Sequence, residues 1–155
     1  MATTSDVDVD RKALLVPAAA PFYETLAPFA YTLIRVALGL ILVPHGFAKL
    51  FQGDAVAASR NFVNFGWPYP LAWAYFIGAL EFFGGLMLAV GLFTRIVAAA
   101  IVIEMSVISF AVLYPNWSWG KRGMEYALFI GIVAFAILLR GGGRYSLDRL
   151  IGREF

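Results

Sequence analysis

The stretch that decides the fold is PFAYTLIRVALGLILVPHGFAKLF, residues 28–51, an apolar run that nevertheless contains Arg35, His45 and Lys49. A helix rises about 1.5 Å per residue, so about twenty residues cross the roughly 30 Å hydrocarbon layer of a bilayer. This run meets that length. The sequence therefore predicts a membrane-spanning helix that carries charged side chains.

The polar residues of this predicted helix share one face. On a helical wheel the following residues lie within about 80° of one another, with His45 at the edge of the stripe: Arg35, Gly39, Leu42, Gly46 and Lys49. A charge that faces lipid is costly, so this stripe is expected to face protein or water. Pro44 lies on the opposite side and predicts a kink just below His45.

The composition supports a membrane protein. Hydrophobic residues make up 61% of the chain and charged residues 14%, and the mean hydropathy is +0.79, which is well above the range of soluble domains. The net charge of +2 is small, and the basic residues gather at the ends of the apolar segments. This pattern is typical of membrane orientation, and no nucleic-acid partner is predicted.

The chain contains no cysteine and one histidine. Disulfide exchange, thiolate catalysis and cysteine-bound iron–sulfur clusters are therefore excluded within this chain, and no metal site is predicted. Redox chemistry would need a bound organic cofactor or a partner protein.

The predicted fold class is all-α: a membrane four-helix bundle with an interfacial N-terminal arm and a C-terminal amphipathic helix. The predicted regions are a cytoplasmic or interfacial arm at 1–27, a four-span domain at 28–140 and a cytoplasmic tail at 141–155. The predicted spans are 28–51, 71–93, 96–114 and 124–140, with a short amphipathic surface helix within residues 54–65. The arm lacks a basic start and an unbroken apolar centre, so it is not expected to be a signal peptide. In the tail, Gly141 to Gly143 predict a flexible hinge and Ser146 predicts a helix cap.

The distribution of basic residues predicts the orientation. One side of the predicted bundle has Arg11, Lys12, Arg95, Arg140, Arg144, Arg149 and Arg153, and the other has Lys49, Arg60, Lys121 and Arg122. By the positive-inside rule both termini are cytoplasmic. The expected location is a bacterial-type inner membrane, which the chain crosses several times.

Two clusters of charge are predicted inside the bundle. Depths estimated from helix rise bring Arg35 together with Glu81 and Glu104, which lie near the centres of the second and third spans. Such a cluster either handles a ligand or protons, or only locks the helices in one orientation.

Nearer the outer face, His45, Lys49 and Glu125 approach a common level. Each also has a structural explanation. His45 can cap the kink at Pro44, Lys49 can extend to the membrane surface, and Glu125 can balance the dipole of the fourth span.

The chain resembles the DoxX family of small four-helix membrane proteins. The resemblance rests on RVALGLILVPHGFAKLF, on ALEFFGGLMLAVGLFTR, and on MEYALF with the later GGGRYSLD. The positions that match the family's polar and glycine residues are Arg35, His45, Gly46, Lys49, Glu81, Gly91, Arg95, Glu125 and Asp148. The resemblance implies a membrane component of a redox system, including quinone-linked systems. The chain lacks the additional soluble domain of the thiosulfate-oxidising relatives.

The predicted function is a membrane subunit of a quinone-linked oxidoreductase assembly, with no redox centre of its own. The expected catalytic residues are His45, Glu81 and Glu125, and the expected quinone-binding residues are Arg35, Lys49 and Glu104. The expected partners are the lipid bilayer and a soluble or membrane oxidoreductase subunit. The alternatives are a non-enzymatic membrane anchor or assembly scaffold, and a small proton-coupled transporter, which would need to form a homo-oligomer.

Overall fold

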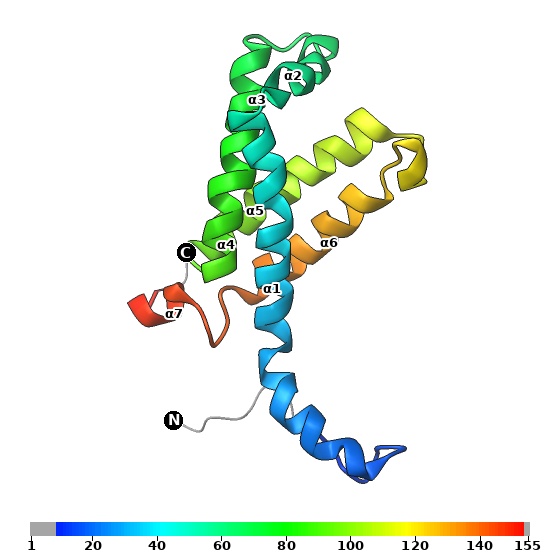
Figure 1. Ribbon diagram of the computed structural model, residues 1–155, viewed down its shortest axis with the longest axis vertical. Helices are drawn as coiled ribbons and strands as arrows, with labels where there is room; N and C mark the ends of the chain where they lie inside the picture. The colour runs from blue at the N-terminus through cyan, green and yellow to red at the C-terminus, as the bar shows by residue number, and fades with distance from the viewer. Residues whose placement is uncertain (1–8, 154–155) are drawn as a thin grey trace.

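The computed structural model describes residues 9–153, which are helical with short connections (Figure 1). The first eight residues of the predicted arm and the last two of the predicted tail lie outside the described residues. In chain order the elements are η1 (Pro17–Ala19), α1 (Ala20–Phe51), α2 (Asp54–Asn64), α3 (Pro70–Ala79), η2 (Leu80–Gly84), α4 (Gly85–Val90), α5 (Thr94–Val107), η3 (Ile108–Leu113), η4 (Trp119–Lys121), α6 (Glu125–Arg140) and α7 (Leu147–Ile151).

The first helix is longer than the sequence analysis predicted. It begins at Ala20 rather than Pro28 and runs for 32 residues. Pro21 lies in its first turn, where a missing N–H breaks no helical hydrogen bond, so this proline does not interrupt the helix. Pro28 and Pro44 both lie inside α1. Figure 1 shows the blue N-terminal part of α1 at an angle to the cyan part, and Pro28 gives a physical reason for such a bend.

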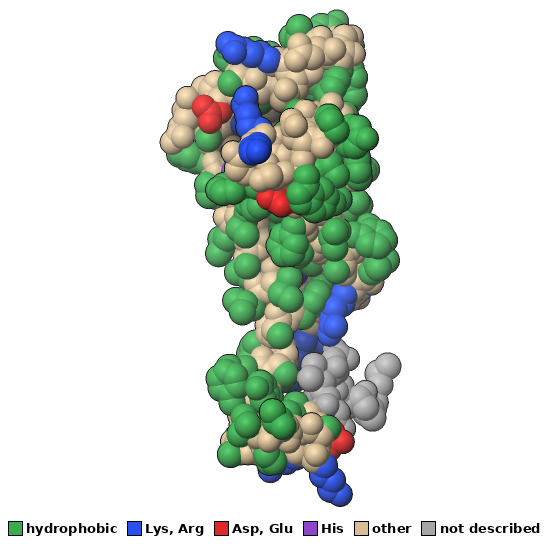
Figure 2. Space-filling model, turned by 90° about the vertical axis from the view of Figure 1, so that its right-hand side faces the viewer, with side chains coloured by type: hydrophobic (Ala, Val, Ile, Leu, Met, Phe, Trp, Pro, Cys, Tyr) green, Lys and Arg blue, Asp and Glu red, His purple; other side chains and the backbone are tan. Residues whose placement is uncertain are grey.

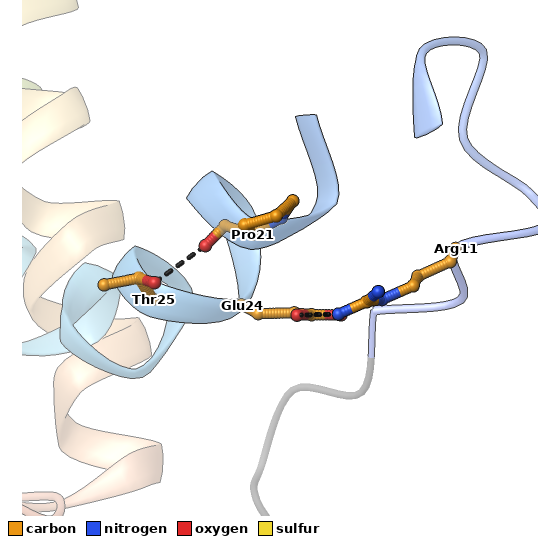
Figure 3. Close-up of polar contacts among 4 residues, drawn as sticks. All are labelled: Arg11, Pro21, Glu24 and Thr25. Carbon is orange, nitrogen blue, oxygen red and sulfur yellow. Dashed lines mark hydrogen bonds and ion pairs between the residues drawn. The ribbon is translucent and has the colours of Figure 1, made fainter. Parts of the chain in front are cut away.

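Polar contacts hold the residues before α1 against its first turns (Figure 3). The guanidinium of Arg11 donates two hydrogen bonds of 2.7 Å to the carboxylate of Glu24. Within α1, the Thr25 hydroxyl donates a hydrogen bond of 2.7 Å to the carbonyl of Pro21, which lies one turn before it. The predicted arm is thus partly a helical extension of the first span.

Three helical segments are long and apolar enough to cross a bilayer: Pro17–Phe51, Pro70–Val90 and Thr94–Leu113. Figure 2 shows Lys and Arg side chains in the upper part, just below the middle and at the bottom of the molecule, and a band with many hydrophobic side chains between the upper and the middle group. The fourth predicted span, α6, has 16 residues, which cover about 24 Å. Three of the four predicted spans are confirmed by length and composition, and the four-helix membrane bundle stays a prediction.

The long helices pack as two pairs. α1 packs along the nearly continuous helix α3–η2–α4, and α5 packs against α6. Figure 1 shows the two pairs diverging toward the end of the molecule that carries α2. Where they meet, a core of buried side chains joins them: Leu38, Leu42, Leu88, Val97, Ala98, Ile101, Met105, Ala127, Ile130, Ala134 and Ile137.

Glycines bring the backbones of α1 and its partner helix into contact. A Cβ atom added to Gly39 would lie 2.8 Å from the Ala89 amide nitrogen, and one added to Gly46 would lie 2.5 Å from the Gly78 carbonyl oxygen. Real Cβ atoms do not approach so closely, so these two contacts fix the register between the helices.

The C-terminal tail is docked onto the bundle. The Ser146 side chain accepts a hydrogen bond from the Arg149 amide and caps α7, as predicted. Asp148 is fully buried, and its carboxylate oxygens accept hydrogen bonds of 2.8 Å and 2.9 Å from the amides of Phe93 and Thr94. The predicted hinge is wrong at its first residues, because Gly141 and Gly142 are buried and a Cβ on Gly142 would meet Ser146.

Candidate functional site

A buried ion pair joins the two helices of the first pair. The Lys49 ammonium lies 2.5 Å from Oε2 of Glu81, and the two side chains are 18% and 5% exposed. Lys49 comes from the last turn of α1, and Glu81 comes from the π-helical segment η2. A Cβ on Gly78 would lie 2.9 Å from the Lys49 Cβ, so this glycine lets the lysine stem lie flat against α3. The wider turn of a π-helix, which is common at functional sites, presents Glu81 here.

Two cavities share this ion pair as part of their walls. The first cavity, of about 350 Å³, is lined by Lys49 and Glu81 together with His45, Arg122 and Tyr126, and otherwise mainly by apolar side chains. We call it the polar cavity after these polar groups. A second cavity of about 330 Å³, the aromatic cavity, is lined by the same ion pair and by five aromatic side chains: Phe62, Phe65, Trp67, Trp73 and Phe76. The ion pair therefore belongs to the walls of both cavities.

Glu104 supplies a second acid to the aromatic cavity. Its side chain is buried, and among the described residues no amide, hydroxyl or basic donor lies within hydrogen-bond distance of its carboxylate oxygens. It is close enough to Glu81 and Lys49 to interact with both electrostatically, and the two carboxyl groups are placed to share a hydrogen bond when one of them is protonated. Two neighbouring buried acids on a cavity wall can exchange a proton, and their remaining oxygen atoms can meet a ligand or water.

Glu81 and Glu104 lie close together as predicted, but Arg35, the third predicted member of this cluster, does not join them. Arg35 is buried, but its guanidinium donates to the carbonyl oxygens of Leu88 at 3.1 Å and Tyr145 at 2.5 Å. Lys49 follows Arg35 by fourteen residues on α1, which is about 21 Å along the helix axis. The glycine contacts set the register of the two helices so that Lys49 faces Glu81. Arg35 instead joins α1 to the end of α4 and to the docked tail. This supports the structural role that the sequence analysis held as an alternative.

The second predicted cluster, of His45, Lys49 and Glu125, is also only partly formed. His45 and Lys49 line the polar cavity together, whereas Glu125 is not among its lining residues. Glu125 is the first residue of α6, and its Oε1 accepts a hydrogen bond of 2.6 Å from the Trp119 amide. A carboxylate in the first turn of a helix is stabilised by the helix dipole, so this contact matches the structural explanation of Glu125.

The sequence analysis did not single out Arg122 or Tyr126, which line the polar cavity. Arg122 belongs to the loop segment PNWSWGKRG, and Tyr126 follows Glu125 directly. Only their position in the sequence could have indicated a role in the site. Both lie where the third and fourth predicted spans connect, at the depth of Lys49. The basic residues of this loop predicted its side of the membrane, and they gave no sign that the loop turns toward α1.

Comparison with known proteins agrees with this architecture. The DoxX family model matches residues 30–113, more than half of the 155 residues. A protein of Mycobacterium tuberculosis (strain ATCC 25618 / H37Rv), named "Uncharacterized membrane protein Rv3486", is 26% identical over 153 residues, which cover 88% of this chain and 92% of that protein. No solved structure matches the chain. The matched segment contains Lys49, Glu81 and Glu104, and the chain is a membrane protein that belongs to the DoxX family.

Proposed function

We propose that this chain is the membrane subunit of an oxidoreductase assembly and that its aromatic cavity binds the ring of a quinone. The observation that carries the proposal is the buried carboxyl group of Glu104, next to that of Glu81, on the wall of an aromatic cavity. The ion pair of Lys49 and Glu81 lies on the same wall and also lines the polar cavity.

The residues present fit such a ligand. The cavity volume of about 330 Å³ lies within the range of roughly 300–1,000 Å³ that is usual for small-molecule sites. Trp67 and Trp73 offer flat apolar surfaces on which a planar ring can stack. The carbonyl oxygens of a quinone only accept hydrogen bonds, and the Lys49 ammonium on the cavity wall is a donor.

When bound, a quinone would accept two electrons from a partner subunit and two protons, which gives the quinol. In this proposal the chain itself supplies the proton path. Glu104 and Glu81 exchange protons at the aromatic cavity, and Lys49 orients the ligand by donating a hydrogen bond. His45 lines the polar cavity, whose walls include the same ion pair, so it can pass protons between that cavity and Glu81. Glu125 and Arg35 have no part in this path.

The proposal is tested by quinone binding to the full chain in detergent. Trp67 and Trp73 line the cavity, so a short-chain ubiquinone analogue is expected to quench tryptophan fluorescence in a saturable way. Glu104→Leu keeps the approximate size of the side chain and removes the carboxyl group that, when protonated, donates to a quinone carbonyl oxygen. A hydrogen bond between neutral groups contributes about 0.5–1.5 kcal/mol, so the apparent Kd is expected to rise about two- to tenfold.

Glu24→Leu is the matched control, because Glu24 pairs with Arg11 near the start of α1 and lies outside both cavities. Its Kd should equal that of the unaltered protein. The proposal is wrong if the unaltered protein shows no saturable quenching, or if Glu104→Leu and Glu24→Leu bind the analogue equally well.

A further inference from the structure

A third cavity lies where the tail docks, at the opposite end of the bundle from the ion pair. Its volume is about 570 Å³, and most of its lining is basic: Arg140, Arg144, Arg149 and Arg153, with Asp148, Gly143 and Gly152. The four arginine side chains are exposed. We call these four residues with the cavity between them the arginine pocket.

Basic residues outnumber acidic ones in the arginine pocket. Of the residues between 9 and 153 that line the cavity, four are arginines and Asp148 is the one acid. Both carboxylate oxygens of Asp148 already accept hydrogen bonds from the backbone amides of Phe93 and Thr94. Like charges gathered around one cavity repel one another, and a bound anion removes this repulsion. Guanidinium groups match the oxygen atoms of a phosphate group in two-pronged hydrogen bonds.

The fold holds these arginines in place. Arg140 ends α6, and its guanidinium lies 4.6 Å from the centre of the Tyr31 ring. Arg149 belongs to α7, and the buried Asp148 of this helix accepts hydrogen bonds from the Phe93 and Thr94 amides at the α4–α5 turn. Arg35 donates to the carbonyl of Tyr145, next to Arg144. The arginines therefore converge on one cavity from two segments that the buried contacts hold together.

The surroundings of the pocket point to a phospholipid as the source of the phosphate. The Asp148 amide donates to the Gly91 carbonyl at 2.9 Å, so the pocket lies at the level where the helix Pro70–Val90 ends. Beside the arginines, Leu150 and Ile151 are 82% and 57% exposed. Apolar side chains next to basic ones suit the boundary between acyl chains and headgroups.

We propose that the arginine pocket binds the phosphate group of an anionic phospholipid. The proposal uses none of the residues of the two cavities beside Lys49 and Glu81, so it stands or falls independently of quinone binding.

The test measures lipid retention by native mass spectrometry of the full chain released from detergent. Phosphatidylglycerol and phosphatidylcholine are titrated separately, and phosphatidylglycerol is expected to bind at least tenfold more tightly. In R144Q/R149Q the apparent Kd for phosphatidylglycerol should rise roughly thirtyfold, because each basic residue near a lipid surface contributes about 1 kcal/mol. R60Q removes an exposed charge from α2, far from the pocket, and should change this Kd less than twofold.

Three outcomes would overturn the proposal: equal affinity for the two lipids, a loss in R60Q as large as in R144Q/R149Q, or displacement of phosphatidylglycerol by millimolar inorganic phosphate. The last result would identify a site for a soluble phosphate. If R144Q/R149Q does not fold, R153Q at the exposed end of the tail replaces it. A roughly fivefold rise in Kd supports the proposal in that variant, and an unchanged Kd contradicts it.

Discussion

Lys49 shows how the surroundings of one residue decide its role. A lysine near the end of a span can extend to the membrane surface, and the sequence alone allows that explanation. In the structure the Lys49 side chain is only 18% exposed and pairs with Glu81. Two glycines, Gly46 and Gly78, bring the helix backbones close enough for the pair to form inside the protein.

This pair leads to a prediction about stability. In Glu81→Gln the Lys49 ammonium loses its direct partner and keeps only the neighbouring acid Glu104. Breaking a buried pair costs about 3–5 kcal/mol, and the loss of stability is expected to reach at most this range. Replacing both partners, as in Lys49→Met with Glu81→Met, leaves an apolar contact of similar volume and is expected to restore the stability. Thermal unfolding in detergent, followed by circular dichroism, measures the difference.

The same two variants separate stability from function. The double variant should unfold near the temperature of the unaltered protein, yet it should not bind the quinone analogue, because the Lys49 donor is gone. A double variant that unfolds as early as Glu81→Gln would show that the residues contribute through contacts other than their charges.

Single residues were predicted better than their partners. The sequence shows that Arg35, Glu81 and Glu104 lie inside apolar segments, and all three are buried. It does not show which of them meet. The estimated depths assumed that the first helix starts at Pro28, whereas it starts at Ala20. The shift of one helix along another also depends on how their side chains pack together, and the sequence of one helix does not determine this packing.

At the scale of elements, the helix bounds follow from local sequence. The predicted ranges 71–93, 96–114 and 124–140 correspond to Pro70–Val90, Thr94–Leu113 and Glu125–Arg140. Glycine, proline and charged residues end the apolar runs, and this signal lies within each segment. The docking of the tail could not be found this way, since Asp148 binds amides that are 54 and 55 residues away.

The glycine contacts between α1 and its partner helix are open to direct test. In Gly46→Ala the added methyl group would lie 2.5 Å from the Gly78 carbonyl oxygen, a backbone atom that cannot turn aside. The helices must separate, and overpacking of this kind costs about 1–3 kcal/mol. The thermal midpoint should therefore fall in detergent.

Gly120→Ala is the control for this variant. Nothing lies within 4 Å of a Cβ built at Gly120, so the midpoint should stay close to that of the unaltered protein. Equal midpoints for Gly46→Ala and Gly120→Ala would contradict the close approach of the two helices.

On the scale of the whole molecule, the two helix pairs diverge, and the polar and aromatic cavities use residues from both pairs. The sequence predicted two polar clusters at different depths of one bundle. In the structure the polar and aromatic cavities instead share the Lys49–Glu81 pair in their walls. Composition predicts the membrane class well, because hydropathy is a sum over the chain. The angle between helix pairs depends on core side chains from four helices and could not be predicted from one sequence.

The orientation in the membrane is testable because the chain has no cysteine. A single cysteine introduced at Arg60 or at Arg153, both exposed, gives a unique site for a membrane-impermeant maleimide. The excess of basic residues near the termini predicts that Arg60→Cys reacts in intact cells and that Arg153→Cys reacts only after lysis. The unaltered chain is the blank. Reaction of Arg153→Cys in intact cells would contradict cytoplasmic termini.

The length of α1 has a mechanical consequence. Its 32 residues extend about 48 Å, well beyond the thickness of the hydrocarbon layer. The hydrogen bonds of the Arg35 guanidinium and the backbone contacts at Gly39 and Gly46 fix the later part of this helix to its neighbours. A movement of its first turns is therefore expected to bend the helix at Pro28 and to stop at these contacts. Pulling on the N-terminal end should leave the geometry around Lys49 undisturbed.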